Sequence, residues 1–421
     1  MENPLKFPVS AALTPAHDET AMRVSAKVSD LGISPTIAMS SRAAQLRAEG
    51  HDIINLAVGE PDFDTPPFII DAADRAARSG FTRYTAADGS PQIKRAVIEK
   101  YRREYEMEFA TKQVHVASGA KQVIYNAFAA TLDPGDEVVI FSPAWVSYID
   151  VVEFCGGTAV VIPTRFEEGF QPSVAALAAA ITPRTRWVLF NTPCNPTGAV
   201  YARETLIGLL GEIRRHPQIL VMSDEIYEHL TYDGITHEPL AKIAPDLAGR
   251  VLTISGVSKS YAMTGWRIGF AVGPEWLVSA MAKVQSQTAS SSNSPAQAAA
   301  AEALTGDQRL VSEWRMIMQR RRDLALGILR ECPGLKMVTP QGAFYIFLNV
   351  GSFLGLRTPS GNKVVNDAAV TEYLLDAAGV AMVPGVAFAM EPYVRMSFAL
   401  DETRIVEACR RIVAALGRLQ H

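Results

Sequence analysis

Cysteine is scarce in this sequence. Its 421 residues include four cysteines, which lie far apart and form no Cys-x-x-Cys pair, and the seven histidines form no group with metal-ligand spacing. These features argue against a disulfide framework and against a zinc site. We therefore expect no bound metal and a reducing, cytoplasmic location.

Long apolar runs and an excess of charge of one sign are also missing. No run approaches the roughly 18 apolar residues of a membrane-spanning helix, and the first 25 residues lack the basic start and apolar core of a signal peptide. The net charge of −4, from 40 basic and 44 acidic residues, gives no field suited to nucleic acid or an anionic membrane. We expect neither as a partner.

Apolar residues make up 48% of the chain, which is enough for a large core. Between residues 65 and 300, short apolar or β-branched runs alternate with longer helical patterns. The runs cover residues 137–141, 187–191, 219–222, 251–254 and 268–272. Continuous apolar runs are typical of strands buried on both faces, so the sequence predicts an α/β fold with a mostly parallel central sheet flanked by helices.

Capping residues, prolines and polar segments between these runs predict the helix boundaries and the domains. Residues 36–49 predict a helix with Thr36 as its N-cap, and Ser90-Pro91 predicts the start of another. Residues 286–294 predict a weakly structured stretch before the long helix that carries Arg320, Arg321 and Arg322. We expect an N-terminal arm over 1–30, a large domain over 65–311, and a smaller α+β domain built from 31–64 and 312–421.

Several polar motifs follow predicted strands, where an open parallel sheet binds its ligands. Ser118-Gly119-Ala120-Lys121 follows the run 114–117 and precedes a helical pattern over 122–132. Small residues that open a helix leave backbone N–H groups free, and together with the helix dipole they suit a phosphate. An ordinary turn that caps a helix is the alternative interpretation of this motif.

Two other loops carry reactive side chains. Asp224 follows the run 219–222, where a carboxylate can pair with a protonated pyridine nitrogen, and Tyr227 can reach a phenolic oxygen on the same ring. Lys259 lies among small and apolar residues, which favour the neutral, nucleophilic amine, and Arg267 can bind a phosphate. Taken singly, each side chain also fits an ordinary loop.

The run Gly256–Gly269, GVSKSYAMTGWRIG, resembles the lysine signature of the class I pyridoxal-phosphate-dependent aminotransferases. The resemblance extends along nearly the whole chain and is strongest to the bacterial aspartate aminotransferase branch. The other motifs are GEPDFDTP (59–66), LDPGDEV (132–138), NTPCNPTG (191–198), SDEIYEHL (223–230), GAFY (342–345) and VRMSF (394–398). The resemblance implies a fold-type I enzyme that transfers an amino group from an L-amino acid to a 2-oxo acid by a ping-pong mechanism. Aspartate and glutamate, with oxaloacetate and 2-oxoglutarate, are the leading substrates.

The same resemblance implies how pyridoxal 5′-phosphate binds. Lys259 would hold it as an internal aldimine and act as acid and base, and Asp224 would pair with the pyridine nitrogen. Tyr227 and Asn195 would contact the phenolic oxygen, and Trp145 would stack on the ring. The phosphate would bind residues from two subunits, so we expect a homodimer with shared active sites. The phosphate ligands would be Ala120, Lys121 and Arg267 of one subunit and Tyr84 of the other.

The substrate residues are implied in the same way. Arg395 would bind the α-carboxylate in a two-pronged ion pair, with help from Asn195 and the backbone of Gly59. Tyr148 would support Asp224 from behind. Pro143 and Pro196 are expected to follow cis peptide bonds.

Three positions depart from the family pattern. Gly32-Ile33-Ser34-Pro35 replaces a common Lys-Pro-Ser run before Thr36, which removes a cationic group near the far end of the substrate, although Ser34, Thr36 and Lys121 remain. Gly256 replaces a phosphate-binding serine, for which Ser255 or Ser258 would substitute. Ala144 replaces a tyrosine before Trp145, which would widen the pocket for a bulkier side chain.

These departures leave alternatives open. One is an aminotransferase for an aromatic or other bulky amino acid, and another is a fold-type I lyase, synthase or oxidase, because the same cofactor supports several reactions. A cofactor-sensing transcription regulator would need an N-terminal helix-turn-helix domain, for which the roughly 30 residues before Ser34 are too few.

Overall fold

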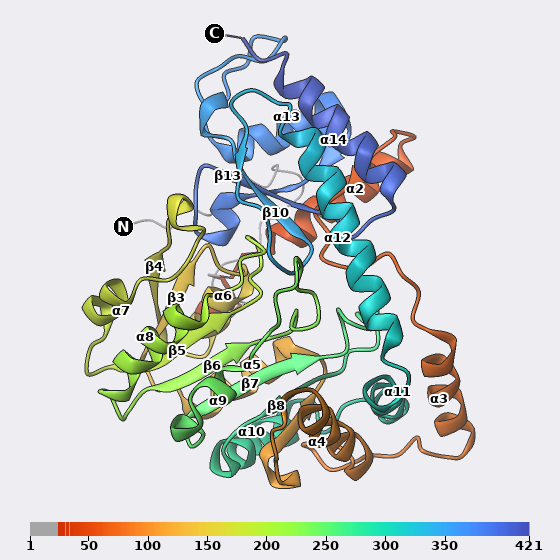
Figure 1. Ribbon diagram of the computed structural model, residues 1–421, viewed down its shortest axis with the longest axis vertical. Helices are drawn as coiled ribbons and strands as arrows, with labels where there is room; N and C mark the ends of the chain where they lie inside the picture. The colour runs from red at the N-terminus through yellow and green to blue at the C-terminus, as the bar shows by residue number, and fades with distance from the viewer. Residues whose placement is uncertain (1–23, 30, 33, 421) are drawn as a thin grey trace.

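The computed structural model describes residues 24–29, 31–32 and 34–420 (Figure 1). The predicted arm over 1–30 therefore lies almost entirely outside the described residues, as does Ile33. Within the described part, helix α1 covers Ala26–Ser29. No helix among these residues has both the length and the apolar character needed to cross a membrane.

A seven-stranded sheet forms the centre of the fold, with strand order β2-β8-β7-β6-β5-β3-β4. All neighbouring strands pair in parallel except β8, which is antiparallel to both β7 and β2. This arrangement confirms the predicted α/β fold and its mostly parallel sheet. The strands are β2 (Val114–Ala117), β3 (Glu137–Ser142), β4 (Thr158–Pro163), β5 (Thr185–Asn191), β6 (Leu220–Asp224), β7 (Val251–Gly256) and β8 (Gly269–Val272).

Both faces of this sheet are covered, because successive side chains of a strand point to opposite sides. Val138 and Ile140 of β3 pack toward α5 (Ala120–Thr131) and α10 (Glu275–Thr288). Val139 and Phe141 pack toward the opposite layer. That layer contains α7 (Val174–Ala180), α8 (Arg203–Arg214) and α9 (Leu240–Ile243). The continuous apolar runs of the sequence thus reflect burial on two sides.

The edge next to β2 and β8 is covered by three further helices, which share one apolar cluster with these strands. They are α3 (Pro67–Arg78), α4 (Pro91–Tyr105) and α11 (Ser294–Thr305). Pro91 occupies the first turn of α4, as the sequence predicts, because that turn needs no backbone N–H donor from it. Helix α6 (Ser147–Phe154) packs on the face that α5 covers.

A second, smaller set of strands and helices is built mainly from the C-terminal part. A four-stranded antiparallel sheet has the order β12-β13-β10-β9, and β1 pairs in parallel with β11. Figure 1 shows the long helix α12 reaching from the region of α11 up to α14. The strands are β1 (Ile54–Asn55), β9 (Lys336–Met337), β10 (Tyr345–Asn349), β11 (Val380–Ala381), β12 (Val383–Pro384) and β13 (Tyr393–Ser397). The helices are α2 (Pro35–Ala48), α12 (Arg309–Leu329), α13 (Asp367–Ala378) and α14 (Glu402–Leu416).

One local expectation was wrong and another holds in part. Helix α2 begins at Pro35, one residue earlier than predicted, and Ser34 rather than Thr36 is its N-cap, because proline fits the first helical position. Within the stretch 286–294, residues 289–293 lie outside both helices, whereas α10 continues to Thr288 and α11 begins at Ser294. Thr288 donates its hydroxyl hydrogen bond back to the carbonyl of Val284 at 3.0 Å, and Asn293 caps α11, so polar side chains here support helices.

The seven-stranded sheet lies within residues 114–272 and the four-stranded sheet within 336–397. The domain boundaries at residues 64 and 311 stay a prediction. Strand β4 was missed, although residues 159–162 are as apolar as the predicted runs. The peptide bonds before Pro143 and Pro196 are cis, as expected, and so are those before Pro193 and Pro392.

The core of the large sheet gives a stability prediction. Trp187 is 0% exposed, and its indole donates to Thr131 at 2.9 Å. Trp187→Ala should reduce the free energy of unfolding by about 3–5 kcal/mol, through the cavity and the lost burial. The matched control, Trp276→Ala, removes an indole that is 49% exposed and should change it by only about 0.5 kcal/mol. Equal shifts of the urea midpoint for both variants would contradict this packing.

Candidate active site

The carboxyl ends of neighbouring parallel strands bring several predicted residues to one edge of the large sheet. Asn191 ends β5 and Asp224 ends β6, and the Asn191 side chain donates to the Asp224 carbonyl at 3.0 Å. Lys259 lies just beyond β7, the next strand in the sheet. The order of strands, rather than the order of residues, therefore groups the reactive side chains.

Lys259 is held against a segment from the N-terminal part of the chain. Its Nζ donates to the carbonyl of Gly59 at 2.6 Å. Burial lowers the pKa of Lys259 to about 8; Glu60 opposes this effect, whereas the positive charges of Arg395 and Arg267 add to it. A minority of molecules therefore carries the neutral amine near neutral pH, which is the form that a nucleophile or a proton acceptor requires.

An ion pair fixes the segment that supplies the Gly59 carbonyl. Arg321 of α12 donates to both carboxylate oxygens of Asp62, at 2.5 and 2.9 Å. The guanidinium carbon lies 5.0 Å from the ring centre of Phe63, which stacks on Trp314 at 4.4 Å. This buried arginine therefore ties the GEPDFDTP motif to the helix that reaches the large sheet.

Asp224 is a buried carboxyl group that lacks a cationic partner among the described residues. It accepts hydrogen bonds from the Tyr148 hydroxyl at 2.6 Å and from the Ile226 backbone at 3.2 Å. Burial raises the pKa of Asp224 to about 6 in spite of these hydrogen bonds. A protonated ring nitrogen beside it would stabilise the anion, so this position fits a pyridine cofactor. The contact with Tyr148 confirms the predicted support from behind.

Arg395 of β13 is a buried guanidinium without a carboxylate among the described residues. It donates to the Asn195 side-chain oxygen at 3.0 Å and to the Ala57 carbonyl at 2.6 Å. The rings of Tyr345 and Phe388 lie 4.5 and 4.9 Å from its central carbon. Its Nε has no hydrogen-bond partner in the described chain, and burial lowers its pKa. A bound carboxylate would supply both the missing charge and the missing acceptor.

Tyr227 lies beside this arginine site. Its hydroxyl group is 2.9 Å from the hydroxyl of Tyr345, and burial raises the pKa of Tyr227 well above its usual value. It therefore stays a neutral donor over the physiological range. Asn195, next along the edge, is fixed by its backbone hydrogen bond to the Asn191 side chain at 2.8 Å.

The start of α5 has the free backbone donors expected of the predicted anion cradle. The backbone N–H groups of Ala120 and Lys121 have no acceptor among the described residues. Arg267 is exposed beside them and donates to the Ser118 carbonyl at 3.3 Å. Gly119 has a φ of 90° and leaves space for the Arg267 guanidinium, which a Cβ would overlap. Free N–H groups, a helix start and a guanidinium together suit a phosphate.

The two serines offered in place of a residue at Gly256 differ in their contacts. Ser255 is buried and donates its hydroxyl hydrogen bond to Glu228, behind the sheet edge. The Ser258 hydroxyl forms no hydrogen bond in the described part of the chain. These contacts favour Ser258 as the free donor.

The last two predicted residues, Trp145 and Tyr84, differ in their placement. Trp145 is half-buried, lies edge-on to Tyr148 at 5.2 Å, and carries the Lys121 amine 4.9 Å above its ring. Tyr84 is 89% exposed and contacts none of the other predicted site residues within the described chain. The fold therefore assembles the predicted set in one chain except for Tyr84.

Sequence reasoning missed three groups around Arg395. The Ala57 carbonyl and the ring of Phe388 lie in segments without a motif, whereas Tyr345 belongs to the quoted GAFY run but was given no role. The segments that contain Ala57 and Phe388 carry no distinctive sequence signal. Only Tyr345, which belongs to a quoted motif, could have been predicted to lie at the site.

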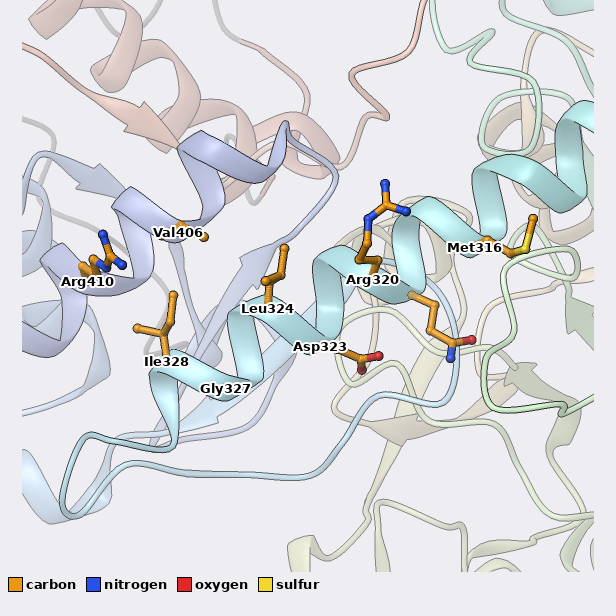
Figure 2. Close-up of a pocket in the computed structure, with 9 residues that line it drawn as sticks. Met316, Arg320, Asp323, Leu324, Gly327, Ile328, Val406 and Arg410 are labelled. Carbon is orange, nitrogen blue, oxygen red and sulfur yellow. The ribbon is translucent and has the colours of Figure 1, made fainter.

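A groove elsewhere on the molecule is not part of this site (Figure 2). It has a volume of about 710 Å³ and lies between α12 and α14, where Leu324, Ile328 and Val406 form its apolar lining. None of the predicted site residues lines it. The chemistry-bearing residues thus gather at the sheet edge and not at this groove.

Comparison with known proteins gives a consistent result. A family model described as aminotransferase class I and II matches residues 51–412. The chain is 45% identical to an aspartate aminotransferase of Rhizobium meliloti, over 95% of this chain and 98% of that protein. It is 48% identical to an aspartate/prephenate aminotransferase of Cereibacter sphaeroides, over 90% and 95% of the two chains.

Solved structures agree with the sequence relatives. The crystal structure of the Rhizobium meliloti aspartate aminotransferase is similar with a TM-score of 0.92 at 45% identity, covering 95% of this chain and 100% of that one. The Thermus thermophilus aspartate aminotransferase with maleate has a TM-score of 0.86 at 41% identity, covering 94% and 100%.

The close contact between β8 and the start of α5 gives a prediction for the phosphate cradle. A Cβ at Gly269 would lie 2.5 Å from the carbonyl carbon of Gly119 and 2.8 Å from the Cα of Ala120. Gly269→Ala should displace this turn and raise the dissociation constant for pyridoxal phosphate roughly tenfold or more, as loss of one or two charge-assisted hydrogen bonds would. Binding is measured by equilibrium titration of the cofactor-free protein.

The control for this substitution is Gly211→Ala, because a Cβ at Gly211 in α8 meets nothing within 4 Å. It should leave cofactor affinity unchanged. Wild-type affinity in the Gly269→Ala protein would show that the cradle tolerates displacement and would contradict its assigned role.

Proposed function

The chain belongs to the class I and II aminotransferases, and we propose that its leading substrates are aspartate and glutamate with the matching 2-oxo acids. It depends on pyridoxal phosphate and takes an amino acid and a 2-oxo acid. The observation that carries the assignment is the meeting of a buried amine of lowered pKa, an unpaired buried carboxyl group and an unpaired buried guanidinium at one sheet edge. The relatives named above act on aspartate by their names, and maleate, in one of their structures, is a dicarboxylate.

The cofactor fits the residues at this edge. Pyridoxal phosphate supplies an aldehyde that captures amines and a pyridine ring that accepts electrons from the adjacent carbon. In our proposal Lys259 would bind the aldehyde, Asp224 would pair with the ring nitrogen, and Tyr227 with Asn195 would contact the phenolic oxygen. Trp145 would stack on the ring. The phosphate would bind Ala120, Lys121, Ser258 and Arg267.

The reaction then assigns separate work to three side chains. Arg395 holds the α-carboxylate of each substrate in a two-pronged ion pair, oriented by Asn195. Lys259 supplies the amine that would take the proton from the substrate Cα as a general base. Asp224, when ionised, would stabilise positive charge on the ring nitrogen. Both substrates use the same arginine in turn, which gives ping-pong kinetics.

Specificity for the far end of the substrate rests on few charged groups. Lys121 is exposed above Trp145 and supplies a positive charge, whereas Gly32 supplies none. Ala144 is buried and donates its backbone hydrogen bond to Phe388 at 3.0 Å, beside the ring that flanks Arg395. The small side chain at this position supports the second candidate, an aminotransferase for an aromatic amino acid.

We also propose a homodimer with shared active sites and a cytoplasmic location. The exposed side chain of Tyr84 supports the first, since 89% exposure suits a residue that completes the site of a second copy. The four unpaired cysteines are compatible with the second.

A donor panel tests the substrate assignment. Holoenzyme is mixed with aspartate, glutamate, phenylalanine, alanine and lysine, and conversion of the cofactor to its amino form is followed by absorbance. Aspartate and glutamate should give the highest kcat/KM for this half-reaction, because Lys121 favours a distal carboxylate. A higher value for phenylalanine would establish the aromatic alternative, and conversion by none of the donors would refute transamination.

Lys259→Ala tests the proposed acid and base. The half-reaction rate should fall by a factor of at least about 10²–10⁴, because the amine that moves the proton is removed. Lys283→Ala, which removes an exposed lysine from α10, should leave the rate unchanged. Normal turnover in the Lys259→Ala protein would show that the assignment is wrong.

Subunit mixing tests the shared site. Lys259→Ala dimers should be inactive and Tyr84→Ala dimers should bind the cofactor weakly, but each hybrid dimer contains one site with both residues intact. An equal mixture, reassembled from separated subunits, should regain roughly a quarter of wild-type activity. Activity equal to the sum of the two separate proteins would place Tyr84 outside the partner's site.

A further inference from the structure

Behind the sheet edge, buried polar side chains connect α4 to the two loops that carry Asp224 and Lys259. We call this set the Lys100 ring. Helix α4 contributes three of its members, the loop after β6 contributes two, and two serines flank Lys259. The members are Lys100, Glu104, Tyr105, Glu228, His229, Ser255 and Ser260.

Glu228 is the first junction of the ring. Its carboxylate, 3% exposed as a residue, accepts hydrogen bonds from Lys100 at 2.7 Å, from Tyr105 at 2.6 Å and from Ser255. Burial alone would raise the pKa of Glu228, but Lys100 together with His229 and His237 outweighs burial and lowers the pKa. The loop after β6 is thereby fixed both to α4 and to the end of β7.

His229 is the second junction. Its Nε2 lies 2.9 Å from the Glu104 carboxylate, and its Nδ1 lies 2.8 Å from the Ser260 hydroxyl. Since an ionised carboxylate can only accept, Nε2 carries a proton, and in the neutral ring Nδ1 accepts from Ser260. Glu104 also pairs with Lys100 at 2.9 Å.

The side-chain contacts and the backbone from Ser255 to Ser260 together form a closed ring. They run from Ser255 through Glu228, Lys100, Glu104 and His229 to Ser260, and the chain from 255 to 260 contains Lys259. Glu104, Glu228 and His229 have the spacing of a metal site, but the Lys100 ammonium already lies between the two carboxylates. The ring is complete without a metal ion.

We propose that the Lys100 ring is a positioning device that fixes Lys259 relative to Asp224 and Tyr227, so that Ser260, His229 and Glu228 are positioning residues for the reaction. This inference rests on the proposed function. Tyr227, Glu228 and His229 lie in the short segment that follows Asp224, the last residue of β6, and Ser255 and Ser260 precede and follow the lysine. A displacement of either loop would leave a charged or polar group unpaired in a buried setting, where such a loss is most unfavourable.

The test breaks the ring at two places that do not touch each other. Ser260→Ala and Glu228→Gln should each lower kcat for the donor half-reaction by roughly tenfold to a hundredfold, with KM nearly unchanged, because small misplacements of a reacting group have effects of this size. The double variant should lose no more than about twofold beyond the worse single variant. If the losses of kcat in the two single variants multiply in the double variant, the two substitutions act independently and the proposed positioning role is overturned.

Two readouts do not depend on turnover. The rate at which cofactor-free protein recaptures pyridoxal phosphate should fall with kcat in both variants, and the pH midpoint of the bound cofactor's absorbance should shift. Lys94→Met is the control, since Lys94 lies on the same helix, α4, but pairs with Asp88 outside the ring. It should change only the melting temperature.

The outcomes separate this inference from the proposed function. If none of the donors converts the cofactor of the wild-type protein, the proposed transamination is refuted. Cofactor recapture and the absorbance midpoint still test the ring in that case. If Ser260→Ala lowers only the melting temperature and leaves both of these readouts at wild-type values, the ring is structural alone and the inference is overturned. Ser260→Ala removes a single oxygen atom, so the test remains available if Glu228→Gln does not fold.

Discussion

The contact between the Lys259 amine and the Gly59 carbonyl is the interaction on which the rest of the site depends. At 2.6 Å it joins a loop of the large sheet to a segment 200 residues earlier in the chain. Arg321 holds that segment through Asp62, and Arg395 lies close enough to lower the pKa of the amine. A change in any of these partners changes the environment of the reacting nitrogen.

The site also contains buried charged groups that lack ion-pair partners among the described residues. Asp224 is buried without an ion-pair partner and Arg395 without a carboxylate among the described residues, and burial lowers the pKa of Lys259 although Glu60 opposes this effect. Buried charges without partners are unfavourable, so ligands that bring the opposite charges bind where these groups lie. A protonated pyridine and an α-carboxylate would satisfy Asp224 and Arg395 in turn. Burial keeps the pKa of the lysine amine low.

Much of this arrangement could be predicted from the sequence, because strand ends and motifs are local signals. Asp224 and Lys259 follow apolar runs that proved to be β6 and β7. Other features depend on packing between distant segments. The carbonyl of Ala57 meets Arg395 across 338 residues, and nothing in the sequence near Ala57 indicates it. Ser255 and Ser258 looked equivalent until the contact with Glu228 distinguished them.

The central claim is that this fold makes one lysine amine neutral enough to react near neutral pH. The direct measurement is the rate at which cofactor-free protein forms the absorbing adduct with pyridoxal phosphate, recorded as a function of pH with Lys259→Ala as the blank. The account predicts a rise with a midpoint at about 8. A midpoint near the ordinary lysine value of about 10.4 would contradict it.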